Sequence, residues 1–292
     1  MRRIASAAPW SRTLAHPPGS ALREFQSLET MAHPFLTEWA AWQPNTVPYV
    51  FPGDEVLLSP RARQAIVTHS SPKKYIASEC FNTPDDTKLH LGLHPMPILG
   101  DLARAKVVFL LLNPGLRPGD YFAESDHQDY WTALRRSTQQ KLKGVEYPFL
   151  FLDPSFSWHS GFLWWTRKLA PIIREVLAKR RASPQDALRT LSQSVANIEL
   201  YPYHSRRFCL PAHVRRQLRS VELARSFVTE VLLPKARSGK VLLVVMRRKR
   251  DWGLSTRKRR GVLSFNVSEA RGAHLSTNTK IGRAVLERLG LS

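Results

Sequence analysis

An asparagine stands where the most apolar segment of the chain ends. The stretch VVFLLLNPGLRPGD, residues 107–120, opens with six apolar residues and then turns at Asn113, Pro114 and Gly115. A buried strand that ends in this way places a polar side chain at the rim of a sheet, where open α/β folds bind their ligands. Asn is a poor base, so this side chain would orient water and stabilise charge rather than remove a proton. The same three residues also form a tight turn without any catalytic role.

A second group of polar residues follows another apolar run. In NIELYPYHS, residues 197–205, Glu199, Tyr201 and His204 stand where the run gives way to a loop. An ionised carboxylate only accepts hydrogen bonds, so Glu199 suits the exocyclic amine of a cytosine better than the carbonyl of uracil or thymine. Pairing of Glu199 with one of the many arginines is the structural alternative.

Basic residues outnumber acidic residues by a wide margin. The chain has 44 Lys and Arg against 23 Asp and Glu, a formal net charge of +21. A surplus of this size indicates an anionic partner, and the phosphates of a nucleic acid are the usual one. A basic surface kept for solubility and a ribosome-type binding protein are the alternatives. The residues that follow predicted strands, and that we expect to contact DNA phosphates, are Arg206, Arg207, Arg247, Arg248, Lys249, Arg250, Arg257, Lys258, Arg259 and Arg260.

Short apolar runs separated by longer helical segments indicate the fold class. The runs cover residues 106–112, 196–201, 241–246 and 262–265, and the helical segments cover residues 130–142, 161–178, 184–194, 211–233 and 280–289. This alternation is typical of parallel strands that are joined by helical crossovers and buried on both faces. The sequence therefore predicts an α/β fold with three αβα layers and a short, mainly parallel, four-stranded central sheet.

The remaining segments are expected to surround this core. Residues 1–34 are predicted to be a disordered basic arm and residues 35–292 a single domain, in which an irregular cover with one or two short helices (35–94) precedes the core (95–292). The two cysteines, Cys80 and Cys209, exclude a disulfide scaffold and a four-Cys metal centre, and they suit a reducing cytoplasm. No apolar run approaches the roughly 18 residues that span a bilayer. We expect a cytoplasmic monomer with no membrane association and no obligate protein partner.

At VVFLLLNPGL the sequence resembles the uracil-DNA glycosylase superfamily, and within it the mismatch-specific uracil and thymine glycosylases, whose first motif is an apolar strand followed by Asn-Pro-Gly-Leu. The resemblance spans roughly residues 95–291. It implies that Asn113 positions the attacking water, that Pro114 and Gly115 border the base pocket, and that Phe122 stacks on the extruded base. It also places Glu199, Tyr201 and His204 where members of the superfamily recognise the base edge.

The last loop, RGAHLS at residues 271–276, departs furthest from that superfamily. Alignment on Leu275 and Ser276 puts Arg271 at the leading position, where a guanidinium would stabilise an anionic leaving base, and His274 competes for this role. Leu275 would be the wedge that enters the duplex. A solvated loop that caps the final helix is the alternative.

These residues together predict a monofunctional DNA glycosylase that needs no metal or cofactor and leaves an abasic site after flipping its target base. A modified cytosine of foreign phage DNA, hydroxymethylated or glucosylated, is the hypothesised substrate. One alternative is a catalytically silent nucleic-acid-binding protein. Another is a metal-dependent nuclease that uses the acids between Asp120 and Asp129, although no HxH, HExxH or DxD spacing supports it. If Asp120 or Asp126 enters the pocket, it would supply the carboxylate that Asn113 lacks. Trp164 and Trp165 are expected to pack within the helical layer, and the alternative is that an exposed aromatic here lengthens the base pocket.

Overall fold

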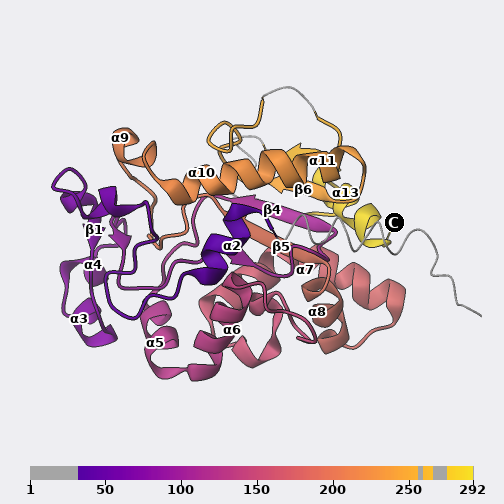
Figure 1. Cartoon of the computed structure of the whole chain (residues 1–292). Helices are drawn as coiled ribbons and strands as arrows, with labels where there is room; N and C mark the ends of the chain where they lie inside the picture. Colours follow the sequence, from indigo (N-terminus) through magenta and orange to yellow (C-terminus); the bar gives the residue numbers. More distant parts are fainter. Residues whose placement is uncertain (1–31, 256–258, 266–274, 292) are drawn as a thin grey trace, which may run out of the picture.

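A five-stranded sheet forms the centre of the protein, and its strands follow the order β3-β5-β4-β6-β7 (Figure 1). The computed structural model describes residues 32–255, 259–265 and 275–291. The parallel strands are β4 (Val107–Leu111), β5 (Val195–Glu199), β6 (Leu242–Val245) and β7 (Val262–Ser264). The short strand β3 (Ile98–Leu99) runs antiparallel at the edge of β5. The predicted α/β class is confirmed, and the sheet has one strand more than expected because a two-residue strand shows no periodicity.

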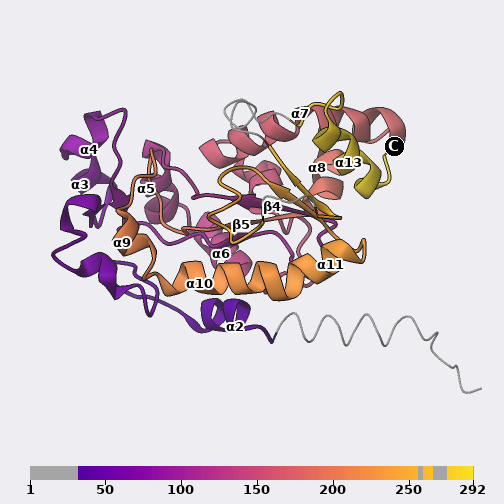
Figure 2. The ribbon, with the colours of Figure 1, turned by 90° about the horizontal axis from the view of Figure 1, so that it is seen from above.

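Helices cover both faces of this sheet, which gives the three predicted layers (Figure 2). Val107 and Phe109 of β4 face one apolar layer, whereas Val108 and Leu110 face the other, as alternation along a strand requires. The first layer contains α6 (Gln128–Thr138), α7 (Ser160–Arg180), α8 (Pro184–Ser192) and α13 (Lys280–Leu289). The second contains α2 (Pro34–Ala41), α10 (Arg219–Ser226), the π-helical segment Phe227–Leu232 and α11 (Leu233–Arg237). Within the described residues, no helix is both long and apolar enough to cross a membrane.

The register between β4 and β5 decides which side chains share a face. Leu111 of β4 is paired with Glu199 of β5, and Phe109 is paired with Asn197. The two polar side chains of β5 therefore lie on the same face as Phe109, toward α7. Both are buried, so the α7 side of the sheet carries polar groups inside an otherwise apolar layer.

The N-terminal cover contains more regular structure than the sequence predicts. A small two-stranded parallel sheet pairs β1 (Ile66–Val67) with β2 (Leu89–His90). Besides α2, the cover contains the 3₁₀ turns Glu55–Leu58 and Arg63–Ala65 and the helices α3 (Pro72–Ile76) and α4 (Glu79–Asn82). Elements this short have no recognisable period, and contacts with the core stabilise them instead.

Long-range contacts also divide the helix predicted over residues 211–233. It consists of α9 (Ala212–Arg215) and then α10, which continues through the π-helical segment into α11. The carboxylate of Asp54, from the cover, accepts hydrogen bonds from the backbone nitrogen of Ser220 at 3.0 Å and from its hydroxyl at 2.5 Å. This contact satisfies a free N–H group in the first turn of α10, and it joins residues that are 166 positions apart.

Two further segments connect the layers near the end of β4. Helix α5 (Pro118–Asp126) begins with a proline and lies in a stretch for which the sequence predicts no element. The carboxylate of Asp120 accepts a hydrogen bond from the backbone nitrogen of Arg117 at 2.7 Å and so caps this helix. The 3₁₀ turns Leu150–Leu152 and Pro154–Phe156 then lead into α7.

Candidate active site

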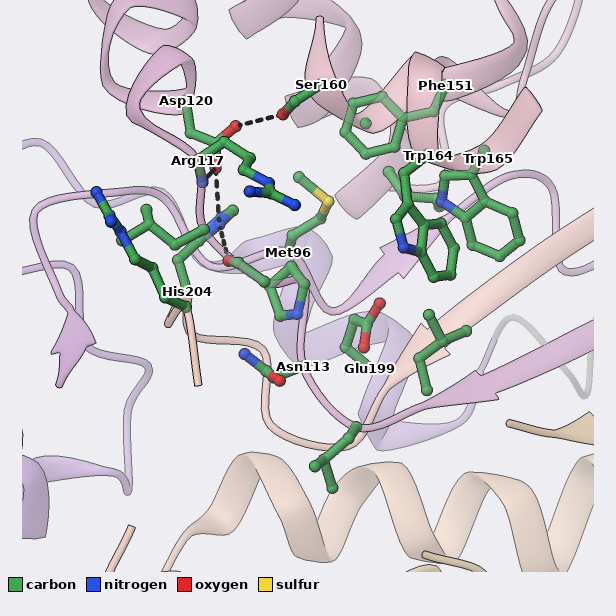
Figure 3. A pocket seen from close by; sticks show the side chains of 18 of the residues that line it. Met96, Asn113, Arg117, Asp120, Phe151, Ser160, Trp164, Trp165, Glu199 and His204 are labelled. Atoms are coloured by element: carbon green, nitrogen blue, oxygen red, sulfur yellow. Dashed lines mark hydrogen bonds and ion pairs between the residues drawn. The ribbon is translucent and has the colours of Figure 1, made fainter. Parts of the chain in front are cut away.

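A cavity of about 560 Å³ opens at the carboxyl ends of β4 and β5. In Figure 3, Asn113 and Glu199 lie on one side of it, Asp120 and Ser160 on the opposite side, and Trp164 and Trp165 along one wall. The site residues from the sequence analysis that line this cavity are Asn113, Pro114, Gly115, Glu199, His204, Arg206 and Arg247. The edge of the sheet that the sequence identified is therefore hollow and lined with polar side chains.

Asn113 is held so that one of its two polar atoms remains available. Its Nδ2 donates to the Ser205 hydroxyl at 3.0 Å and to the Ser205 carbonyl at 3.3 Å. Oδ1 is then the atom that can accept a hydrogen bond from a water molecule. The turn behind it depends on Gly115, whose φ of +77° lies in the left-handed region. The carbonyl of Gly115 accepts a hydrogen bond from Nδ1 of His204 at 3.0 Å, which joins the two strand ends.

Glu199 is a buried carboxyl group in which one oxygen has no hydrogen-bond partner among the described residues. It is 4% exposed, and its Oε1 accepts a hydrogen bond from Nδ2 of Asn197 at 2.9 Å. Its Oε2 is buried and has no hydrogen-bond partner among the described residues. Burial raises the pKa of Glu199 well above its ordinary 4.5, so the neutral acid is the favoured form. The hypothesis of an ionised carboxylate therefore changes: the neutral acid offers one donor and one acceptor.

Asp120 brings a second carboxyl group into the cavity, as the sequence analysis had considered. Its Oδ1 accepts a hydrogen bond from the Ser160 hydroxyl at 3.3 Å and lies 3.4 Å from Nε2 of His159. Burial raises its pKa from 3.8 to about 6, against the lowering effect of the hydrogen bonds from Arg117 and Ser160. Asp120 is consequently a carboxylate near neutral pH but a stronger base than an exposed aspartate.

The sequence analysis did not identify His159 as a site residue, although its ring lies next to Asp120 in the cavity. Its ring is stacked between Tyr130 and Phe151, with centroid distances of 4.7 Å and 5.0 Å. Nδ1 accepts a hydrogen bond from the backbone nitrogen of Gly161, so the proton resides on Nε2, which lies 3.4 Å from Oδ1 of Asp120 but forms no hydrogen bond among the described residues. Burial lowers the pKa of His159 to about 4, which keeps the ring neutral. The sequence signal was a histidine two residues before a predicted helix.

Aromatic and basic side chains complete the lining. Phe151, Trp164 and Trp165 form an aromatic wall, as in the alternative in which an exposed aromatic of this segment lengthens the pocket. Trp164 is 38% exposed and so borders the mouth of the cavity. The basic side chains of the lining are Arg117, Lys168, Arg206 and Arg247. Arg206 is fixed in place, since it donates to the Tyr75 hydroxyl at 2.8 Å and to the Phe81 carbonyl at 2.9 Å.

Several predicted site residues lie elsewhere. Phe122 is 39% exposed on α5 and does not line the cavity. Tyr201 is buried in the opposite apolar layer, where it stacks on Phe208, because β5 ends at Glu199 and the alternation of the strand ends with it. The prediction of Leu275 as an exposed wedge is wrong: it is 1% exposed and packs in the apolar layer of α7 and α13.

The predicted phosphate contacts are likewise divided. Arg207 forms an ion pair with Asp85 at 3.5 Å, and Arg248 forms one with Asp251 at 3.5 Å. The residues that the structure describes but places outside the cavity lining are Arg207, Arg248, Lys249, Arg250, Arg259 and Arg260. Arg257, Lys258, Arg271 and His274 lie outside the described residues.

The acids considered for a metal-dependent nuclease have separate structural partners. Glu124 accepts hydrogen bonds from the backbone nitrogen of His94, and Asp126 accepts one from Ser125. Within residues 32–255, 259–265 and 275–291, none of the acids between Asp120 and Asp129 belongs to a cluster with metal-ligand spacing. The geometry gives the nuclease interpretation no support.

The chain has no significant match among protein-family models, curated proteins or solved structures. The resemblance to the uracil-DNA glycosylase superfamily thus stays a prediction based on the residues themselves.

Proposed function

We propose that this chain is a monofunctional DNA glycosylase, which takes a flipped base into the cavity and hydrolyses its N-glycosidic bond. The observation that carries the proposal is the convergence of Asn113, Asp120 and Glu199 on one cavity beside an aromatic wall. A cavity of about 560 Å³ falls within the range of about 300–1,000 Å³ that is typical of ligand sites. An aromatic wall grips a base by stacking, and polar groups recognise its edge.

Asn113 and Asp120 would have different roles toward the attacking water. Oδ1 of Asn113 orients the water, and the carboxylate of Asp120 accepts its proton as the oxygen bonds to the anomeric carbon. The C–N bond breaks at the same time, and its electron pair leaves with the base. A base with a pKa of about 6 is ionised at neutral pH, and general-base catalysis typically contributes about 10²- to 10⁴-fold. The carboxylate also stabilises positive charge that develops on the sugar.

The basic side chains of the cavity suit both the leaving base and the phosphates. Arg117, Lys168 and Arg247 place positive charge around a cavity in which the pKa of Glu199 is raised toward the neutral form. A base that departs as an anion is stabilised by such charges. Arg247 is exposed at the end of β6, where it can reach a phosphate that flanks the flipped nucleotide.

Neutral Glu199 suits a base edge that presents an acceptor next to a donor. The ring nitrogen and exocyclic amine of cytosine have this arrangement, and so do the carbonyl and ring N–H of uracil or thymine. The volume of the cavity leaves space for a substituent on the ring, which favours a modified cytosine as the substrate. Glutamine reproduces the donor and the acceptor of the neutral acid. Glu199→Gln should therefore retain base release within about tenfold, whereas Glu199→Ala should lose about 10²-fold.

Release of a free base from defined DNA tests the proposal. The protein is incubated with DNAs that carry uracil, a thymine mismatch, hydroxymethylcytosine or glucosylated hydroxymethylcytosine, and the released base is identified by mass spectrometry. We expect release in the presence of EDTA, and a loss of about 10²-fold or more in Asn113→Ala with DNA binding unchanged. Asn45→Ala, at an exposed asparagine outside the cavity, is the matched control.

Three results would contradict the proposal. DNA binding without release of any base would indicate a silent binder. Strand cleavage that EDTA abolishes would indicate a nuclease. Base release that Asn113→Ala leaves unchanged would place the chemistry elsewhere. Release of uracil alone would keep the glycosylase and exclude the modified cytosine.

A further inference from the structure

A second cluster of buried polar side chains lies in the N-terminal cover, outside the cavity. It contains Cys80 of α4, His90 of β2 and Asp86 of the loop between them. One potential ligand atom from each residue lies within 4.8 Å of the other two, and all three residues are buried. A thiol, a carboxylate and an imidazole brought together in this way have the donor chemistry of a zinc site.

His90 has the orientation of a metal ligand whose second ring nitrogen is fixed by a hydrogen bond. Its Nδ1 forms a hydrogen bond with the Tyr121 hydroxyl at 3.0 Å, and its Nε2 faces Oδ2 of Asp86 at 2.8 Å. Ligating histidines typically use one ring nitrogen for the metal and the other for a fixing hydrogen bond. Two ligands of a tetrahedral zinc ion lie about 3.3 Å apart, so the Nε2 to Oδ2 distance needs to open by about 0.5 Å.

His69 is a separate observation that points to the same place. Its Nε2 is buried and has no hydrogen-bond partner among the described residues, and its ring centroid lies 6.0 Å from that of His90. The parallel register pairs Val67, the last residue of β1, with His90, and His69 follows two residues after Val67. A buried imidazole nitrogen without a partner is costly, and a metal ion would satisfy it.

We propose that Cys80, Asp86 and His90 bind a zinc ion and that His69 becomes the fourth ligand by rotation of its side chain. The set comprises one sulfur, one oxygen and two nitrogens, a combination that suits tetrahedral zinc. On binding, the Cys80 thiol releases its proton to solvent, and the thiolate and the Asp86 carboxylate then balance the two charges of the ion. This proposal departs from the expectation of a metal-free protein, and it is independent of the proposed reaction, which needs no metal.

The site would stabilise a part of the protein that has little regular structure of its own. Helix α4 has four residues, and the carbonyls of Phe81 and Thr83 at its end hold the guanidinium of Arg206. The backbone nitrogen of His90 donates to the carbonyl of His204 at 2.8 Å. Arg206 and His204 both line the cavity, so a metal ion here would support the cavity from outside without touching a substrate.

Cobalt substitution in the full-length protein tests the site. The chain is dialysed against a chelator and titrated with Co²⁺, and we expect one equivalent to bind with a thiolate-to-cobalt charge-transfer absorption that Zn²⁺ then abolishes. Cys80→Ser should abolish this absorption, whereas Cys209→Ser should retain it. Cys209 is exposed and is the other cysteine of the chain, so it provides the matched control. Zinc should also raise the Tm of the wild-type protein but not that of Cys80→Ser.

Further variants test the remaining ligands, and the wild-type titration tests the site even if a variant fails to fold. Asp86→Asn and His69→Ala should each weaken metal binding by at least about tenfold. Absence of charge-transfer absorption in the wild-type titration would overturn the proposal, whatever the variants do. The same absorption in Cys80→Ser would overturn it as well, and unchanged affinity in His69→Ala would overturn the assignment of the fourth ligand.

Discussion

Replacement of Asp120 by asparagine removes a buried charge while it keeps the shape of the side chain. Asp120 is 6% exposed, and its carboxylate faces the Ser160 hydroxyl and Nε2 of His159, with His204 4.0 Å away. Both histidines are neutral, because burial lowers the pKa of His159 to about 4 and that of His204 to about 3. The hydrogen bonds around Asp120 therefore compensate only in part for the loss of water, and its pKa rises from 3.8 to about 6.

This raised pKa makes ionised Asp120 a cost to the folded state. A rise from 3.8 to about 6 corresponds to about 3 kcal/mol, at about 1.4 kcal/mol per pKa unit. Below pH 3.8 the group is protonated in both the folded and the unfolded state, so no cost arises. As the pH rises through 3.8 the unfolded chain ionises first, and the cost reaches its full value above about pH 6. By linkage, about 2 kcal/mol of this loss in the free energy of unfolding develops between about pH 4.5 and about pH 7.5.

Urea unfolding at a series of pH values measures this cost directly. The free energy of unfolding of Asp120→Asn, minus that of the wild type, should increase by about 2 kcal/mol from about pH 4.5 to about pH 7.5. Asp126→Asn, at an exposed carboxylate of the same helix, is the matched control and should show no comparable rise. A difference that stays constant with pH for Asp120→Asn would refute the reasoning about burial. If the group is also the base, wild-type base release should increase through about pH 6, and the variant should lose about 10²- to 10⁴-fold.

Two further changes test the packing of Leu275 and the proposed phosphate contact of Arg247. Leu275→Ala should lower the free energy of unfolding by about 2–5 kcal/mol in urea, because it leaves a cavity in a packed layer; a stable variant that no longer flips bases would restore Leu275 as a wedge. Arg247→Ala should reduce by about 1 the slope of log affinity for duplex DNA against log salt concentration. Arg248→Ala should change this slope less, since Arg248 is paired with Asp251 and lies outside the cavity lining. Equal effects of the two variants would exclude a specific phosphate contact at Arg247.

Local patterns were sufficient where the apolar run or the capping residues of a segment already specify its element. Six apolar residues before Asn113 predict a strand buried on both faces, and β4 is the central strand. The closing helix was predicted at residues 280–289, where α13 is found. Its capping residues, Thr279 and Gly290, directly adjoin it in the sequence. The positions of Asn113 and Glu199 at one edge also follow from the parallel sheet alone, since the carboxyl ends of parallel strands meet.

Contacts between distant segments decided the rest. Asp120 and Ser160 are 40 positions apart, and the packing of α5 against the N-terminus of α7 brings them together, so no spacing in the sequence reveals the pair. The protonation of Glu199 depends on its burial, which sequence cannot measure. Tyr201 was misplaced because β5 ends at Glu199, so the alternation of the strand does not extend to residue 201. Leu275 was misplaced because a residue expected in an exposed loop is buried. Periodicity records which face a side chain takes within its own element, whereas the electrostatic environment of a side chain is determined by elements elsewhere in the chain.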